Sequence, residues 1–241
     1  MTVTPIRAGG THLASDMVLV HKVFRRELGL LPTLVAAVPQ GRAERATLLA
    51  KHYRELATAL RHHHAAERDL LWRRLAERAP LDPAVRDAVQ GWHRRHDELI
   101  DELDGMLDLW VAAADPDVRD LLVDILAELA NAVTEHLDLV ESRVLPEVDR
   151  HFTGREWLAL GLRAASWIPL NRMAWMLGAM LEDATDAERR NLMGKVPGPA
   201  RLLYKMVGQE QYAREMRVLR DHCSPQGPDP AAPGLPDRAA A

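Results

Sequence analysis

Two residues on one predicted helix face carry chemistry that a protein core does not normally contain. Between 49 and 72 the residues Leu49, Tyr53, Leu56, Leu60, His63, Glu67 and Leu70 recur at intervals of three and four. This spacing places all of them on one face of a helix. His63 and Glu67 are an imidazole and a carboxylate one turn apart among core residues. Because an unpaired buried carboxylate is costly, we expect a bound metal cation to compensate Glu67.

Three other predicted helices each carry one histidine on an otherwise apolar stripe. The helix at about 12–38 has Ala14, Met17, His21, Phe24, Leu28, Leu31 and Val35. The helix at about 84–113 has Val85, Val89, Trp92, His96, Leu99, Leu103, Met106 and Trp110. The helix that begins at 115–116 and fades near 151–154 has Leu122, Leu126, Leu129, Val133, His136, Val140 and Val144. Together with the helix at about 42–79, which holds His63, four stripes carry four histidines.

The lengths of these segments predict an all-α fold in which the four histidines meet. Four long amphipathic helices joined by short turns form an up-down-up-down four-helix bundle. His21 and His63 lie 19 and 23 residues from the first turn, and His96 and His136 lie 19 and 21 residues from the third. The mismatches correspond to roughly 3 to 6 Å along the bundle axis. We therefore expect the four imidazoles at one level inside the bundle.

A second carboxylate, Glu141, follows His136 by five residues. Five residues turn an α-helix by about 500°, so Glu141 lies roughly 140° around from His136. Either Glu141 reaches the site from the flank, or the helix is locally widened by a π-turn. A buried set of four histidines and two carboxylates suits iron, while manganese and zinc remain open, as does the choice between one metal and two. No histidine here has a glutamate three residues before it, which disfavours the ferritin type of di-iron bundle.

The motifs around these residues resemble those of the hemerythrin-like (HHE cation-binding) family over about 12–151. They are Asp16-Met17 before His21 with Phe24-Arg25-Arg26-Glu27-Leu28 after it, His63-x3-Glu67 before Leu70-Leu71-Trp72, His96, and His136-x4-Glu141 before Val144-Leu145-Pro146. The resemblance implies a non-haem iron centre, commonly with two Fe per chain, that binds peroxide, dioxygen or nitric oxide. It implies that the four histidines are terminal ligands and that Glu67 and Glu141 bridge the metals.

The third predicted helix departs from the pattern of oxygen-carrying hemerythrins, which have two histidines one turn apart there. The positions four residues from His96 are Trp92 and Ile100. His93 is three residues away on a mainly polar flank, although Ile100 could draw it partly inward. A missing fifth histidine leaves a ligand position open, which disfavours reversible oxygen carriage and favours redox chemistry or sensing.

The remaining histidines are expected outside the ligand set. His62 and His64 flank His63 and could be extra ligands; we expect His62 in solvent, and for His64 a supporting position beside the ligands is a further alternative. We predict surface positions for His12, His52, His151 and His222. Tyr53 is expected to pack above the site with its hydroxyl hydrogen-bonded.

The resemblance ends near Gly154, and 155–220 is predicted to be a helical extension. The segment 157–181 is apolar but is interrupted by Arg163, Pro169, Asn171 and Arg172, so we expect one or two helices packed on the bundle rather than a membrane span. A last helix is predicted at 201–220, and 224–241 is predicted to be disordered. The segment 157–220 could cap the bundle, form a homodimer or bind a partner.

Composition narrows the classes of function. The 241 residues have a formal net charge of −4, which provides no basic footprint for nucleic acid. The single cysteine, Cys223, excludes a disulfide framework and a thiolate metal site, and 1–10 lacks the apolar run of a signal peptide. We expect a cytoplasmic protein.

Three functional hypotheses follow from the predicted site. The first is an iron protein that reacts with peroxide or oxygen, with catalase-like disproportionation as its enzymatic form. The second is a sensor that signals through the C-terminal helices. The third is simple binding of iron or oxygen.

Overall fold

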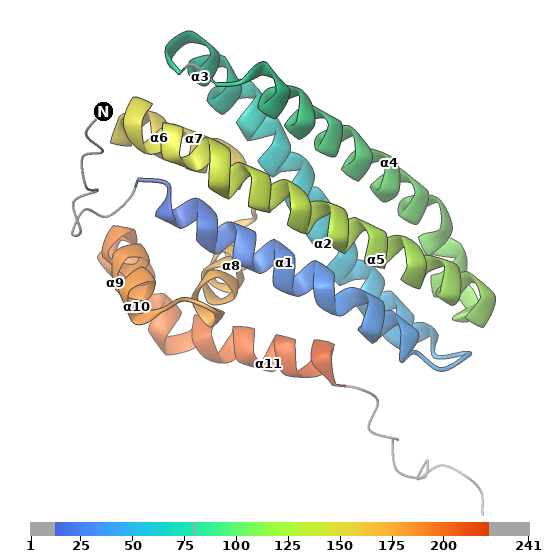
Figure 1. Ribbon diagram of the computed structural model, residues 1–241. Coiled ribbons are helices and arrows are strands. Elements are labelled where there is room, and N and C mark those ends of the chain that lie inside the picture. Colours follow the sequence, from blue (N-terminus) through green and yellow to red (C-terminus); the bar gives the residue numbers. More distant parts are fainter. Residues whose placement is uncertain (1–12, 80, 222–241) are drawn as a thin grey trace, which may run out of the picture.

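The computed structural model describes residues 13–79 and 81–221, and it contains no strand within those ranges (Figure 1). Four rods form the bundle: α1 (Ser15–Ala36); α2 (Ala43–Ala66) with η1 (Glu67–Trp72) and α3 (Arg73–Arg78); α4 (Pro83–Ala113); and α5 (Pro116–Leu139) with η2 (Val140–Val144) and α6 (Leu145–His151). The extension contains α7 (Gly154–Ala165), α8 (Leu170–Glu182), α9 (Asp186–Lys195), α10 (Gly198–Leu203), η3 (Tyr204–Gly208) and α11 (Gln209–Arg220). The predicted tail, 224–241, lies outside the described residues, as do His12 and His222.

The predicted all-α four-helix bundle is confirmed. Aspartate caps begin two of the rods: the Asp82 side chain accepts from the backbone N–H of Ala84, and Asp115 accepts from those of Asp117 and Val118. A proline follows each cap, where its fixed φ favours the first helical turn. Ala114 ends α4 in the left-handed conformation, with φ 46°. The chain reverses within two residues there, so α4 and α5 are antiparallel neighbours.

The bundle interior consists of two apolar clusters. One fills the end of the bundle near the turn between α1 and α2, and its fully buried members include Leu31, Leu103 and Trp110. The other fills the opposite end and includes Leu75 and Val148. Along the bundle axis, the predicted histidines lie between these two clusters. Apolar packing therefore borders the layer of histidines on both sides.

The C-terminal extension covers the α1 side of the bundle. In Figure 1 the helices from α8 to α11 gather on the side of α1 that faces away from α4. A capping box in which Thr153 and Glu156 bond reciprocally begins α7, and Thr185 and Glu188 begin α9 in the same way. The last predicted helix is divided into α10, η3 and α11. None of the described helices combines the length and apolarity needed to cross a lipid bilayer.

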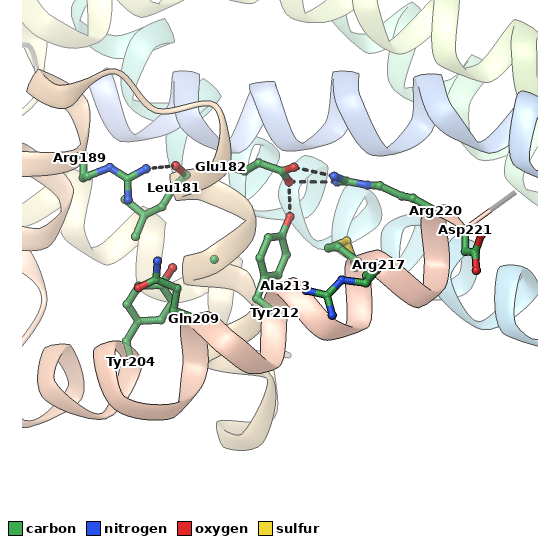
Figure 2. Close-up of a pocket in the computed structure, with 12 residues that line it drawn as sticks. Leu181, Glu182, Arg189, Tyr204, Gln209, Tyr212, Ala213, Arg217, Arg220 and Asp221 are labelled. Atoms are coloured by element: carbon green, nitrogen blue, oxygen red, sulfur yellow. Dashed lines mark hydrogen bonds and ion pairs between the residues drawn. The ribbon is translucent and has the colours of Figure 1, made fainter.

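Close packing and charge hold α11 against α8. A Cβ atom added at Gly178 would lie 2.5 Å from the Tyr212 ring, so only glycine allows this approach. Figure 2 shows the Tyr212 hydroxyl donating to Glu182 at 2.5 Å, and Arg220 donating to the same carboxylate at 2.5 and 3.0 Å. An open cavity of about 710 Å³ lies beside these residues.

Candidate metal centre

The structure brings five of the six predicted ligands together inside the bundle. His21, His63, Glu67, His96 and His136 come from four different rods, and each is at most 4% exposed. The donor atoms form three groups, and within each group they lie within 4.8 Å of one another. The groups are His21 with His63 and Glu67, Glu67 with His93 and His136, and His64 with His96 and His136. The four predicted histidines therefore lie at one level between the two apolar clusters.

Glu67 lies between two of these groups. Its Oε1 is 3.3 Å from Nε2 of His63, and its Oε2 is 3.2 Å from Nε2 of His93. Glu67 opens η1, where the helix is widened by a π-turn. A carboxylate whose two oxygens face imidazoles from different rods can offer a donor atom to each of the two groups.

Many donor atoms of this cluster have no hydrogen-bond partner. Both oxygens of Glu67, both ring nitrogens of His64 and His136, and Nε2 of His21, His63 and His93 are buried without one. Buried polar atoms are normally hydrogen-bonded, because leaving one unsatisfied costs about 1–3 kcal/mol. A shared cation would satisfy these atoms together, so the residues present fit a metal.

The protonation states of the cluster also favour a cation. Burial lowers the pKa of His96 to about 4 and that of His136 to about 2, and it lowers the pKa of His64 well below its ordinary value. Burial alone would raise the pKa of Glu67, but the neighbouring imidazoles, His63 first, hold it well below its ordinary value. At neutral pH His64, His96 and His136 are therefore neutral imidazoles and Glu67 is an ionised carboxylate, which are the forms that bind metals.

Glu141 does not join the donor groups. The π-turn that its spacing allowed is present, because η2 spans Val140–Val144. Glu141 remains 28% exposed, and its Oε1 lies 2.8 Å from Nδ1 of His21 and 2.6 Å from a guanidinium nitrogen of Arg25. Since Nε2 of His21 belongs to the unpartnered set, Glu141 contacts the opposite side of that ring. A carboxylate in this position orients a histidine ligand and fixes its tautomer.

His93 and His64, whose roles the sequence left open, both belong to the cluster. They are 7% and 3% exposed, and their rings stack with centroids 4.0 Å apart. The signal for His93 lies in a second stripe on α4. Its buried members, Val85, Val89, His93, His96, Ile100, Leu103, Leu107 and Trp110, follow the alternating three-and-four spacing of a core face. The apparent absence of a fifth histidine on α4 is thereby corrected.

The other described histidines, His52, His62 and His151, lie outside the donor groups and differ in their exposure. The surface position predicted for His52 is wrong: it is 6% exposed, and its Nε2 lies 3.1 Å from the buried carboxylate of Glu27. His62 is half-buried, because its ring stacks on Trp167 with centroids 5.6 Å apart. The His151 side chain is 29% exposed. The Tyr53 hydroxyl donates to the Ile100 carbonyl at 3.2 Å, which confirms that it is hydrogen-bonded.

These features define a four-helix bundle whose centre is a buried cation site of histidines and one carboxylate. The family model for the hemerythrin HHE cation binding domain matches residues 12–148, which is more than half of the chain. The chain therefore belongs to the hemerythrin HHE cation-binding family, whose domain binds metal ions, typically iron. No curated protein and no solved structure matches the chain.

Proposed function

We propose that the chain is a non-haem iron protein that holds two iron ions and disproportionates hydrogen peroxide. The observation that supports two ions is the position of Glu67, whose oxygens face His63 and His93. His21, His63 and Glu67 would hold one ion. Glu67, His93 and His136, with His96 or His64, would hold the other.

Iron bound by histidine and carboxylate ligands supplies redox chemistry toward peroxide or dioxygen. The net reaction converts two molecules of hydrogen peroxide into two of water and one of dioxygen, so it needs no external electron donor. The protein contributes a site enclosed by two apolar clusters, which excludes bulk water. The carboxylate of Glu67 partly neutralises the metal charge, and Glu141 together with Arg25 holds the orientation of His21.

The experiment is iron reconstitution followed by a peroxide assay. We expect about two irons per chain, a ligand-to-metal absorption band, and oxygen release after peroxide is added. His63→Ala should lose iron and oxygen release together. His62→Ala is the matched control, because His62 neighbours His63 in sequence but lies outside the donor groups. Fewer than one iron per chain would contradict the proposal, and so would full loading without peroxide turnover.

A second candidate is a sensor that signals dioxygen, peroxide or nitric oxide through the C-terminal helices. The contacts that favour it join α1 to the extension: Arg220 donates to the buried Glu27 at 2.8 Å, and Lys22 donates to Glu188 at 2.9 Å. Since α1 also carries His21, a change at the metal could move these contacts. A sensor would show no turnover but a ligand-dependent change in protease cleavage after Gly154. Cleavage that is insensitive to the ligand would exclude it.

A further inference from the structure

The extension encloses an apolar cavity beside the candidate metal centre. It has a volume of about 460 Å³ and lies among α1, α2, α7, α8 and α9. This volume falls within the range of about 300–1,000 Å³ typical of small-molecule sites. His63 lines it from α2, and so does Phe24, whose ring centroid is 5.5 Å from that of His63. The cavity therefore reaches the imidazole that we assign to the metal.

The lining is apolar and adaptable. Trp157 and Leu160 contribute from α7, Trp167 from the α7–α8 connection, and Met176 and Met180 from α8. Methionine side chains adjust to irregular occupants, and tryptophan offers broad apolar faces. A smaller cavity of about 200 Å³ shares Trp167 and Met176 with it. Such walls suit an aliphatic molecule rather than a polar one.

One end of the cavity carries charged residues whose charges cancel. Lys195 donates to Oδ2 of Asp16 at 2.6 Å, and both residues line the cavity. The other oxygen, Oδ1 of Asp16, is buried and has no hydrogen-bond partner. The side chains of Asp16 and Lys195 are 26% and 45% exposed, so the Asp16 carboxylate can accept a hydrogen bond from a hydroxyl while the Lys195 ammonium donates to the hydroxyl oxygen. Because these two charges cancel, this end offers no net attraction to a carboxylate head and favours a neutral O–H group.

The geometry also sets a length. From Asp16 to Phe24 the cavity follows α1 for about 12 Å at the helical rise. This is the length of an extended chain of about ten carbon atoms.

We propose that this cavity binds a linear, neutral aliphatic molecule with an O–H head group. The head lies between Asp16 and Lys195, and the chain runs along α1 to Phe24 and His63. Binding does not require the metal, so its success or failure is separable from that of the proposed function. When iron is present, the occupant covers one face of the His63 imidazole.

The test is titration of the full chain, iron-free and iron-loaded, with 1-decanol and with decanoate. Binding is followed by calorimetry and by the emission of Trp157 and Trp167, which line the cavity. We expect saturable binding of one 1-decanol per chain in both forms, and at least tenfold weaker binding of decanoate. The absence of 1-decanol binding would overturn the proposal, and equal or tighter binding of decanoate would overturn the neutral head group.

Two variants locate the site. Gly161 lines the cavity, and a Cβ atom there would meet nothing within 4 Å, so Gly161→Leu should fill the space and weaken 1-decanol binding at least tenfold. Gly105→Leu is the matched control, because it also places leucine at an open helical glycine but on α4. Asp16→Asn leaves the Lys195 charge without its partner. The affinity of the cavity for decanoate should therefore rise relative to its affinity for 1-decanol. Unchanged binding in Gly161→Leu, with the fold intact by circular dichroism, would overturn the location.

Discussion

Glu67 is the residue on which the number of metals depends. It is 1% exposed, and each of its oxygens lies within 3.3 Å of a different histidine. A buried carboxylate without hydrogen-bond partners is destabilising unless a cation balances it. Its charge and its position between two donor groups are the observations on which we base the proposal of two metal ions.

Replacing Glu67 by glutamine tests this role. Glu67→Gln keeps the shape but removes the charge, so we expect iron content to fall from about two per chain to one or none. Glu135→Gln, an exposed position beside His136, is the control. Iron analysis after reconstitution measures the effect, and an unchanged content of two would contradict the bridge.

Glu27 predicts a separate dependence of stability on pH. Burial would raise its pKa, but His52 and Arg26 lower it to about 2. Because the folded pKa lies below the unfolded value, Glu27 stabilises the protein above about pH 4.5, and this contribution is lost as pH falls toward 2. Glu27→Gln should cost about 3 kcal/mol in the free energy of unfolding at pH 7, since Arg26, His52 and Arg220 all lose their contact with this buried charge, although Arg220 keeps its pair with Glu182.

Denaturant unfolding of the parent and of Glu27→Gln at several pH values measures this difference. The difference in the free energy of unfolding between the parent and Glu27→Gln should decrease steadily below pH 4.5. A difference that stays constant down to pH 3 would show that packing, and not charge, accounts for the loss. Glu55→Gln, which leaves Arg172 still paired with Glu215, is a milder ion-pair control.

At the residue scale the sequence predicted the centre of the site better than its edges. His21, His63, His96 and His136 stand alone on apolar stripes, so periodicity alone marks them as buried. His93 and His64 were not included in the predicted ligand set. His93 precedes His96 by three residues and His64 directly follows His63, and in each pair only the predicted ligand was placed on the core face. Their burial depends on how far each rod is rotated about its own axis. That rotation is set by packing against the neighbouring helices and not by the spacing within one helix.

At the scale of elements, two π-turns set the directions of the Glu67 and Glu141 side chains. η1 begins at Glu67 and η2 contains Glu141, and each lies just after the histidine of its rod. A π-turn adds one residue to a helical turn, so it rotates the side chains on one side of it relative to those on the other. The spacing in the fourth helix pointed to such a widening, but the regular spacing of His63 and Glu67 left η1 unpredicted.

Deleting Ser142 tests the widening of η2. Ser142 is exposed, and removing it should restore an α-helix while the residues after it keep their register. Glu141 would then turn away from His21 and lose the 2.8 Å contact. We expect a folded protein that holds iron at least tenfold more weakly. Ser142→Ala, which keeps the chain length, should bind iron like the parent; equal loss in both variants would refute the role of the π-turn.

At the scale of the whole molecule, the bundle followed from periodicity and short turns, whereas the arrangement of the extension did not. Its helices α7 to α11 are short, and their places depend on contacts with α1 and α2 such as the Arg220–Glu27 pair. The partner residue Glu27 lies inside the motif around His21, where nothing in the local pattern marks it for an ion pair with α11. Contacts between residues so far apart in sequence are invisible to local spacing.

Removal of the metal should lower stability by an amount that does not change with pH over the neutral range. Burial lowers the pKa of His96 to about 4, so it stays neutral in the folded protein well below pH 6.5. The unfolded chain binds protons below pH 6.5 that the folded protein does not, which reduces the free energy of unfolding by about 1.4 kcal/mol per pH unit for each such histidine. This loss affects the iron-loaded and iron-free proteins alike, because His64, His96 and His136 stay neutral in both.

Chelation should therefore lower the melting temperature by a similar margin at pH 7 and at pH 5.5, while both melting temperatures fall with the pH. With free iron at a hundred times the Kd of each site, the margin corresponds to about 2.7 kcal/mol per bound ion, or roughly 5 to 10 °C per ion for a chain of this size. Thermal melts of both forms, in buffers that do not bind iron, measure it. If the margin instead disappears as pH falls through 6.5, the histidines titrate like exposed ones in the iron-free fold, and the buried, preformed donor set is wrong.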